Sequence, residues 1–478
     1  MTLTGADYVG WLLRANRRFG PAGELRSGRV FAEAYRTDGR PRLAPSHVTR
    51  WESGGLPAGR DVVRRYERLL GLEPESLVAV RDALYRALPD GSRPPPAGPP
   101  RPDERLHELL DLATSRHPLT GPQWGELTDL VEERPGLVLH PAALWRAIGE
   151  KLLADLITSE GTAWLQRQEA ASRLLEHPAA GRPMIEACID LVEDRRSPAV
   201  IEPLSLLDVT ADPAANAYVL RHLETPDSDR HHQGALLAAV RKIERGHFAG
   251  DQWERLTRAV SVAGADGETG RLLAAVHRAR ADETDTVRRA PADETGAVTP
   301  AGPAAAEEAT ARLGPAGGAD PVLAALVSTA LDGVAVDRRV FAAMTIAQSP
   351  FQEPVSEVLL AGARRDLARR SGGDPARALQ TMTMLGTGVH RPLLLDLLTG
   401  PGHDLAARRA AAWAMPHCGG RFTERQWRRI LAGQRDTSVV HGVTYGIGTD
   451  GHQRLLAEIA ADPSMPEIAR TTARWLHS

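Results

Sequence analysis

One short stretch near the N-terminus presents hydrogen-bonding side chains on a single side of a predicted helix. It reads Pro45-Ser-His-Val-Thr-Arg-Trp-Glu-Ser-Gly-Gly55. Pro45 suits the first turn of a helix, where its missing N–H has no partner, and the two glycines can supply the left-handed residue that ends one. Val48 and Trp51 are three positions apart, so they can be buried together. The opposite side then carries hydroxyl, imidazole and guanidinium groups, which form hydrogen bonds.

The rest of the chain offers little for catalysis or metal binding. It contains no phosphate loop, no Gly-x-Ser-x-Gly, no His-Glu-x-x-His and no close cysteine pair. Its densest histidine group is His222, His231, His232 and His247. Solvated or helix-capping histidines are favoured over metal ligands there, because no cysteine and no carboxylate stands at ligand spacing. His417 and Cys418 are adjacent and therefore rarely face one another. We expect no enzyme activity, no catalytic residue, no cofactor and no metal.

Four further helices are expected to position the polar stretch. The first carries an apolar stripe at Val9, Leu12 and Leu13. Ser27 can cap the second, whose inward residues are Val30, Phe31, Ala34 and Tyr35. Two more follow the stretch, from Arg60 to Leu70 and from Leu77 to Leu88.

Short helices in this order resemble the helix-turn-helix of the phage-repressor (Cro/Xre) family. Ser46 to Gly54 matches the family pattern Ser-x-Ile/Val-Ser/Thr-Arg-Trp/Ile-Glu-x-Gly, followed by a helix ending in Leu69-Leu-Gly-Leu72. The resemblance covers about 80 of the 478 residues. It implies that the second and third helices form the motif and that the third lies in the major groove of DNA. Residues 37–42 lengthen the turn by about six positions, and Gly28 stands where the family often has a phosphate-contacting Gln.

The resemblance assigns roles to eight residues. The candidates for contact with base edges are Ser46, His47, Thr49 and Arg50, of which Arg50 is the best donor for guanine. The candidates for phosphate contacts, which set register without reading sequence, are Arg29, Arg36, Arg40 and Arg42. Alternatively, Arg50 pairs with Glu52 or another acid on the surface; in the family, Glu52 usually supports the fold. Such modules commonly bind as pairs on half-sites, so we expect a homodimer formed through the remainder of the chain.

The charge distribution favours the same reading. Residues 1–88 hold 15 Arg and 10 acidic residues, a net charge of +5, so the other 390 residues carry −8. A basic segment on an acidic remainder is typical of a phosphate-binding module. The arginine excess itself has a simpler explanation. Only Lys151 and Lys242 are lysine among 58 basic residues, which is typical of a GC-rich bacterial genome.

Length and composition predict several units. A chain of 478 residues is long enough for two or three domains. The Pro-rich segment 89–102 reads as a semi-rigid linker, and 281–320 has too few bulky apolar residues to order, so we expect it to be disordered or loosely looped. The predicted divisions are a helix-turn-helix domain at 1–88, linkers at 89–102 and 281–320, and helical-repeat domains at 103–280 and 321–478.

Outside the linkers the apolar pattern is helical almost throughout, so the predicted class is all-α. The clearest stretches are Trp145 to Ile157, Trp164 to Leu175, Tyr218 to Leu223, Ala235 to Ile243, Val322 to Leu331 and Ala406 to Met415. A Gln-Trp pair opens a helix three times, after an apolar residue that can act as a hydrophobic staple, at Trp124, Trp253 and Trp427. Two copies sit in α-α units of about 40 residues, the size that HEAT-like solenoids stack. We expect these tryptophans in the core, rather than as stacking platforms.

These features together predict a transcription regulator that binds double-stranded DNA, with a helical body that dimerises and senses a small molecule, peptide or protein. The alternative is a helical-repeat scaffold tethered to DNA that responds to no effector. Two distant cysteines argue against a secreted disulfide framework. The N-terminus lacks the pattern of a signal peptide, and no apolar run is long enough for a membrane span. A cytoplasmic location is therefore expected.

Overall fold

The computed structural model of the chain describes residues 3–35, 43–88, 103–262 except 198, residue 276, 302–312, 320–368 except 334 and 335, and 375–477. These residues form α-helices joined by turns and short 3₁₀ helices, and no strand occurs among them. The predicted all-α class is confirmed.

The N-terminal helices, residues 3–88, are termed the head. Its helices are α1 (Gly5–Phe19), α2 (Gly28–Ala34), α3 (Pro45–Glu52), α4 (Arg60–Leu70) and α5 (Ser76–Ala87), as the sequence predicts. Thr4 and Asp7 form a capping box at the start of α1. Gly71, in the left-handed conformation at φ 65°, ends α4. The Glu67 carboxylate accepts backbone N–H bonds from Glu75 and Leu77, which fixes the start of α5.

Residues 103–262 form a first stack of helices, termed the first arm. Its helices are α6 (Asp103–Thr114), α7 (Gly121–Glu132), α8 (Ala143–Ile157), α9 (Gly161–Glu176), α10 (Gly181–Glu193), α11 (Ile201–Leu206), α12 (Pro213–Glu224), α13 (Asp229–Glu244) and α14 (Asp251–Val262). Helices two apart in this series, such as α7 with α9 and α11 with α13, pack against one another. That is the arrangement expected of stacked α-α repeats.

Residues 302–477 form the second arm. Its helices are α16 (Gly302–Arg312), α17 (Pro321–Asp332), α18 (Val336–Ala347), α19 (Gln352–Ala368), α20 (Pro375–Leu385), α21 (Arg391–Thr399), α22 (Leu405–Ala414), α23 (Glu424–Ala432), α24 (Thr437–Thr449), α25 (Gln453–Ala461) and α26 (Glu467–His477). The helices α18, α20, α22, α24 and α26 pack in succession along one layer. The body is therefore built of repeated helices, as predicted.

The expectation of a disordered or loosely looped segment at 281–320 is wrong for residues 302–312. These residues form α16, which packs on α17 and α19 and buries Ala305, Ala306 and Ala309. Alanine buries little surface but has the highest helix propensity and allows helices to approach closely. A count of bulky apolar residues therefore does not detect such a helix. The linker predicted at 89–102 lies outside the described residues.

The repeated Gln-Trp pairs are helix starts with a buried ring. In α7 and α23 the glutamine completes a capping box with Thr120 or Thr423. Trp124 and Trp427 are fully buried, which confirms the core prediction for both, whereas Trp253 is only partly buried. The indole N–H groups of the two buried rings donate to Asp155 and Asp450, at 2.8 and 2.7 Å.

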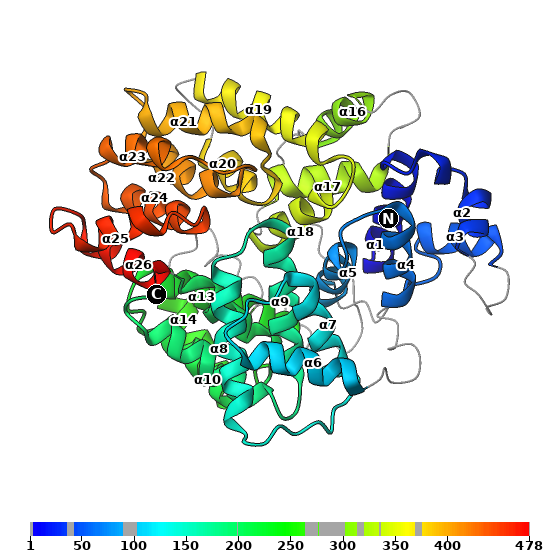
Figure 1. The fold of residues 1–478 in the computed structure, drawn as a ribbon, viewed down its shortest axis with the longest axis horizontal. Helices are drawn as coiled ribbons and strands as arrows, with labels where there is room; N and C mark the ends of the chain where they lie inside the picture. Colours follow the sequence, from blue (N-terminus) through cyan, green and yellow to red (C-terminus); the bar gives the residue numbers. More distant parts are fainter. Residues whose placement is uncertain are drawn as a thin grey trace.

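The head lies at one side of the molecule, against both arms (Figure 1). Its α5 contacts α9 of the first arm and α18 of the second. The apolar core of the head is continuous with that of the second arm, while the first arm has a core of its own. The arms also meet away from the head, where the Tyr445 hydroxyl donates to the Ile157 carbonyl at 3.0 Å.

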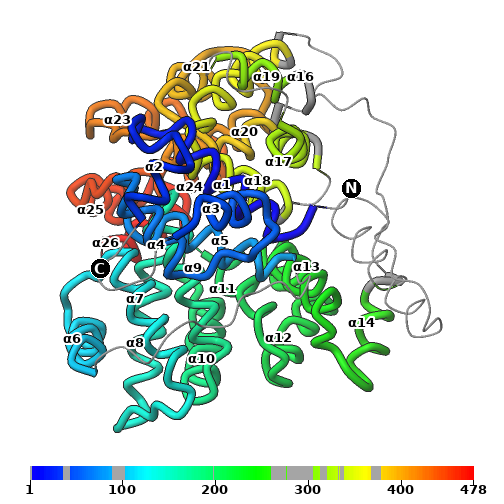
Figure 2. The backbone as a smooth tube through the Cα atoms, turned by 90° about the vertical axis from the view of Figure 1, so that its right-hand side faces the viewer, coloured from blue at the N-terminus to red at the C-terminus, as the bar shows by residue number. Residues whose placement is uncertain are grey.

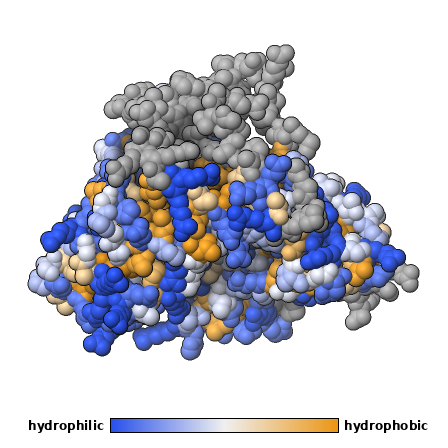
Figure 3. All heavy atoms as spheres, turned by 90° about the horizontal axis from the view of Figure 1, so that it is seen from above, coloured by the Kyte–Doolittle hydropathy of each residue, from blue (hydrophilic) through white to orange (hydrophobic). Residues whose placement is uncertain are grey.

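Much of the face drawn in Figure 3 is polar. Seen from above, hydrophilic residues cover both ends of the molecule, and hydrophobic residues gather in the middle of that face (Figure 3). Among the described residues, the large apolar side chains that stand exposed are Val138, Leu405 and Ile468, which belong to three separate segments. In the same part of the chain, no helix has both the length and the apolar character needed to cross a membrane.

Candidate nucleic-acid interface

The helix α3 buries one face and exposes the other. Val48 and Trp51 are 1% and 8% exposed, as the sequence predicts. The four candidates for base contacts, Ser46, His47, Thr49 and Arg50, are all exposed. In Figure 2, which looks onto the side of the molecule that carries the head, α2 and α3 lie in the foreground. The docking of the head against the arms therefore leaves the polar face of α3 open.

Glu52, the last residue of α3, fixes the end of this helix to α1 and α4. Its carboxylate accepts two bonds from the Arg17 guanidinium, both at 2.6 Å, and one from the Tyr66 hydroxyl at 3.1 Å. Burial acts to lower the pKa of Arg17, but Glu52 more than offsets this effect and the pKa is raised. Burial and Glu52 both raise the pKa of Tyr66. Glu52 therefore supports the fold, as the family resemblance implies, and does not pair with Arg50.

Arg50 is left available at the surface. Among the described residues its guanidinium forms no hydrogen bond and no ion pair. The alternative in which Arg50 is held by a neighbouring acid therefore finds no support in this part of the chain.

Two glycines allow α1 and α3 to approach closely. A Cβ atom on Gly10 would lie 2.6 Å from the Trp51 carbonyl oxygen and 2.8 Å from the Gly54 nitrogen. Gly54 follows α3 at φ 73°, the left-handed conformation predicted for it. Trp51 also contacts Tyr35, with ring centroids 5.5 Å apart. The position of α3 is thus set by backbone packing as well as by Glu52.

The structure describes one of the four candidates for phosphate contacts. Arg29 is exposed on α2. The other three candidates, Arg36, Arg40 and Arg42, lie outside the described residues. Ser27 occupies the N-cap of α2, as predicted, but its side chain forms no capping bond. Gly28 faces open space, because a Cβ atom there would meet no atom within 4 Å.

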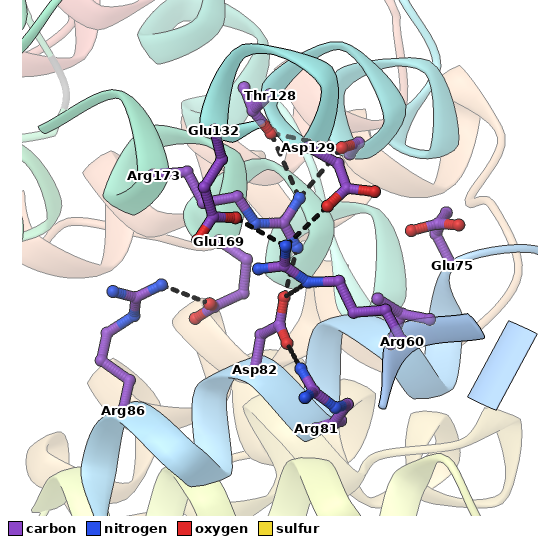
Figure 4. A network of polar contacts seen from close by, with 12 residues as sticks. Arg60, Glu75, Arg81, Asp82, Arg86, Thr128, Asp129, Glu132, Glu169 and Arg173 are labelled. Atoms are coloured by element: carbon purple, nitrogen blue, oxygen red, sulfur yellow. Dashed lines mark hydrogen bonds and ion pairs between the residues drawn. The ribbon is translucent and has the colours of Figure 1, made fainter. Parts of the chain in front are cut away.

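A network of buried charges fastens the head to the first arm (Figure 4). Arg60 of α4 binds Asp82 of α5 at 2.8 Å and Asp129 of α7 at 2.6 Å. Arg173 of α9 also binds Asp82, whose side chain is 1% exposed. Burial acts to raise the pKa of Asp82, but Arg60, Arg173 and Arg81 hold it well below its usual range. Asp82 is therefore ionised at neutral pH.

The second arm holds the head through apolar and polar contacts on α1. The ring of Phe351 lies 5.9 Å from Trp11 and 5.4 Å from Phe19, measured between centroids. Arg14 pairs with Asp320, the N-cap of α17, at 2.9 Å. The head is consequently packed against both arms of the body.

Part of the positive charge of the head is used to dock it against the arms. Four of its arginines neutralise acids of the arms: Arg14, Arg60, Arg64 and Arg86. The sequence alone assigns the net positive charge of residues 1–88 to phosphate binding. Part of that charge instead pairs with acids of the arms. Arg29 and Arg50, by contrast, are exposed and form no ion pair among the described residues.

The histidine group identified in the sequence comes together only in part, and the expectation that no carboxylate stands at ligand spacing is wrong, because Asp227 does. His222 and His231 stack 4.9 Å apart, and their ligand atoms lie within 4.8 Å of one another and of Asp227, close enough to share a cation. However, Arg221 Nη2 lies 3.0 Å from His222 Nε2. Arginine only donates, so Nε2 accepts and the hydrogen of the neutral ring sits on Nδ1. Burial, Arg221 and His231 lower the pKa of His222 to about 4.

Comparisons of the chain with family models, with curated proteins and with solved structures find no match. The geometry of the head is therefore the sole support for a nucleic-acid interface.

Proposed function

We propose that the protein is a sequence-specific DNA-binding regulator of transcription. The observation that carries this proposal is the division of α3 into an anchored face and an exposed polar face. Val48, Trp51 and Glu52 are buried, while Arg50 and the hydroxyl and imidazole groups beside it face outward. A short helix presented in this way can enter the major groove, where an arginine recognises guanine through two hydrogen bonds.

The seating of the head supports regulation by the body. Because α5 packs on both arms, a displacement of one arm relative to the other would alter the surface against which the head packs. A homodimer stays a prediction. It would place two heads on two half-sites, and the body, against which each head is packed, would then set their spacing.

The test begins with genome-wide mapping of bound DNA, followed by gel shifts on the best site and on random duplex. A regulator binds its own site ~10³-fold or more tightly than random DNA. On the best site, Arg50→Ala should weaken binding by about 1–3 kcal/mol. Arg29→Ala should weaken binding to both duplexes alike, because a phosphate contact carries no sequence information.

The matched control is Arg116→Ala, which removes an exposed arginine from the turn between α6 and α7. It should change binding by less than ~0.5 kcal/mol, as expected for a distant surface charge. A loss below ~0.5 kcal/mol for Arg50→Ala would remove Arg50 from the base contacts. A small ratio between the best site and random duplex would instead favour the scaffold.

A further inference from the structure

A cavity of about 560 Å³ lies between the two arms, and that size is typical of small-molecule sites. One wall comes mainly from α9, α11 and α13 of the first arm, and the other comes from α18, α20 and α22 of the second. Trp164 of α9 packs against the core of the first arm and also against the core that the head shares with the second arm. A molecule in this cavity would therefore touch both arms at once.

Most of the residues that line the cavity are apolar or aromatic. Trp164, Phe341 and Trp413 contribute rings from three different helices, and Met344 and Met384 contribute thioethers. Aromatic rings favour stacked or edge-on contacts with other rings, and a thioether makes favourable contacts with a ring edge. These side chains therefore favour a flat molecule that contains rings.

The arginines of the lining have partners within the protein. Arg241 pairs with Asp208 at 3.8 Å, and Arg339 donates to a backbone carbonyl at 2.9 Å. Arg230 lies close enough to Glu202 for that carboxylate to oppose the lowering of its pKa by burial. Each of the three arginines has a further interaction within the protein. An ion that entered the cavity would therefore lose its hydration without gaining a free counter-charge, which is costly.

Several hydrogen-bonding groups of the lining are also engaged. The hydroxyl groups of Ser205, Thr381 and Thr383 donate to backbone carbonyls at 2.6–3.1 Å. The unpaired oxygen atoms of Glu202 and Gln168 are enclosed by the protein, so a ligand does not reach them. A ligand would therefore gain most of its binding energy from the removal of apolar surface from water.

We propose that this cavity binds a small, uncharged organic molecule that contains rings and is held by apolar contact with both arms. This class excludes sugars, phosphorylated compounds and free amino acids, which carry charge or many hydroxyl groups. If the proposed function holds, the bound molecule is the effector that the regulator senses.

The cavity also adjoins the surface against which the head packs. Helices α9 and α18, which line it, both contact α5 of the head. Phe341 and Arg241 line a second cavity of about 390 Å³ as well, and the wall of that cavity includes Tyr8 and Leu84 of the head. A ligand that displaces α18 or the Phe341 ring therefore acts on the surface that supports the head.

The first test is a fluorescence titration of the full chain with 6-propionyl-2-(dimethylamino)naphthalene, an uncharged dye whose emission moves to shorter wavelength in an apolar site. We expect saturable binding at one site per chain. The matched anion is 6-(dimethylamino)naphthalene-2-carboxylate, which has the same rings and a carboxylate in place of the ketone. It should bind at least about tenfold more weakly, because its charge is desolvated without a counter-charge.

Two variants block the cavity from opposite walls. Ala410→Phe places a ring on α22 of the second arm, and Ser205→Phe places a ring on α11 of the first. Each should weaken binding of the uncharged dye by about tenfold or more, because the new ring occupies space that the dye needs. The matched control is Ala217→Phe, which adds the same ring on the exposed side of α12 and should leave binding unchanged.

Circular dichroism and thermal melting identify the variants that are folded, and if one blocking variant fails to fold, the other decides the outcome. Dye binding that survives in a folded blocking variant would overturn the proposal. Equal or tighter binding of the carboxylate would overturn it too, because the cavity would then accept an anion. The same holds for an absence of saturable binding of the uncharged dye.

The titration needs no DNA, so failure of the DNA-binding proposal leaves its result intact, and an absence of dye binding leaves the DNA proposal intact. Where an operator has been found, saturating uncharged dye should change its affinity by about fivefold or more, the range typical of coupled sites. An unchanged operator affinity with the cavity occupied would exclude the effector role and leave the ligand site itself in place.

Discussion

Replacing Glu52 by Gln tests whether the buried ion pair fixes α3. Arg17 and Glu52 expose only 8% and 6% of their side chains and are joined by two bonds of 2.6 Å. In Glu52→Gln the charge of Arg17 stays buried without a counter-charge, and the new amide nitrogen faces a donor. Removing one member of a buried pair costs about 3–5 kcal/mol. We expect the free energy of unfolding to fall by about 3 kcal/mol, because the amide oxygen retains one bond.

The measurement is chemical denaturation followed by circular dichroism, together with hydrogen exchange of residues 45–54. Exchange in α3 should accelerate, since Glu52 connects it to α1 and α4. The control is Glu33→Gln, which removes an exposed glutamate from α2 and should cost less than ~0.5 kcal/mol. A double variant, Arg17→Met with Glu52→Leu, should cost less than the sum of its parts. A loss under ~1 kcal/mol for Glu52→Gln, with α3 exchange unchanged, would refute this account of how α3 is held.

Three more changes test other parts of the fold, each by denaturation. Gly10→Ala should cost about 1–3 kcal/mol, because its Cβ would meet the backbone of Trp51 and Gly54; a smaller loss would show that α1 and α3 can separate. Lys151→Met should cost about 1–2 kcal/mol, because its ammonium donates to three carbonyls at 2.6–2.9 Å; a neutral result would mean that water replaces it. Burial, with Arg230 adding to it, lowers the pKa of His441 to about 3, so between pH 7 and 5 the unfolded chain gains a proton that the folded chain refuses. This contribution to the free energy of unfolding is present above about pH 6.5 and is lost on acidification, by about 2 kcal/mol at pH 5. His441→Phe should abolish this pH-dependent loss, and equal pH slopes for the two proteins would contradict the assignment.

The sequence predicts the helices of the head closely because their signals are local. Pro45, Gly54 and the spacing of Val48 and Trp51 specify α3 within a few residues, and the structure agrees with each. The stapled Gln-Trp starts are local in the same sense. The exposure of Arg50 also follows from one helical period. Such features can be predicted without considering the rest of the chain.

The seating of the head could not be predicted in this way, because its contacts join residues far apart in the sequence. Asp82 and Arg173 are 91 positions apart, and Arg14 and Asp320 are 306 apart. In a chain with 56 arginines, net charge does not distinguish those that pair internally from those that face a partner. The rarity of lysine is a clearer indication of a structural role for Lys151 and Lys242. Both donate to backbone carbonyls, and Lys242 is fully buried, a task for which a compact ammonium suits better than a planar guanidinium.

The contacts of α1 suggest how the body and α3 are mechanically joined. The Arg14 guanidinium donates to Asp320 at the start of α17 and, through its other nitrogen, to the Glu52 carbonyl at the end of α3, at 3.2 Å. Asn16 donates to the Gln348 carbonyl at 2.9 Å, and Arg17, one residue on, holds the Glu52 carboxylate. A single turn of α1 therefore connects the second arm to the last residue of α3. Because these bonds are short and partly buried, a displacement of α17 against the head must either break them or move α3 as well.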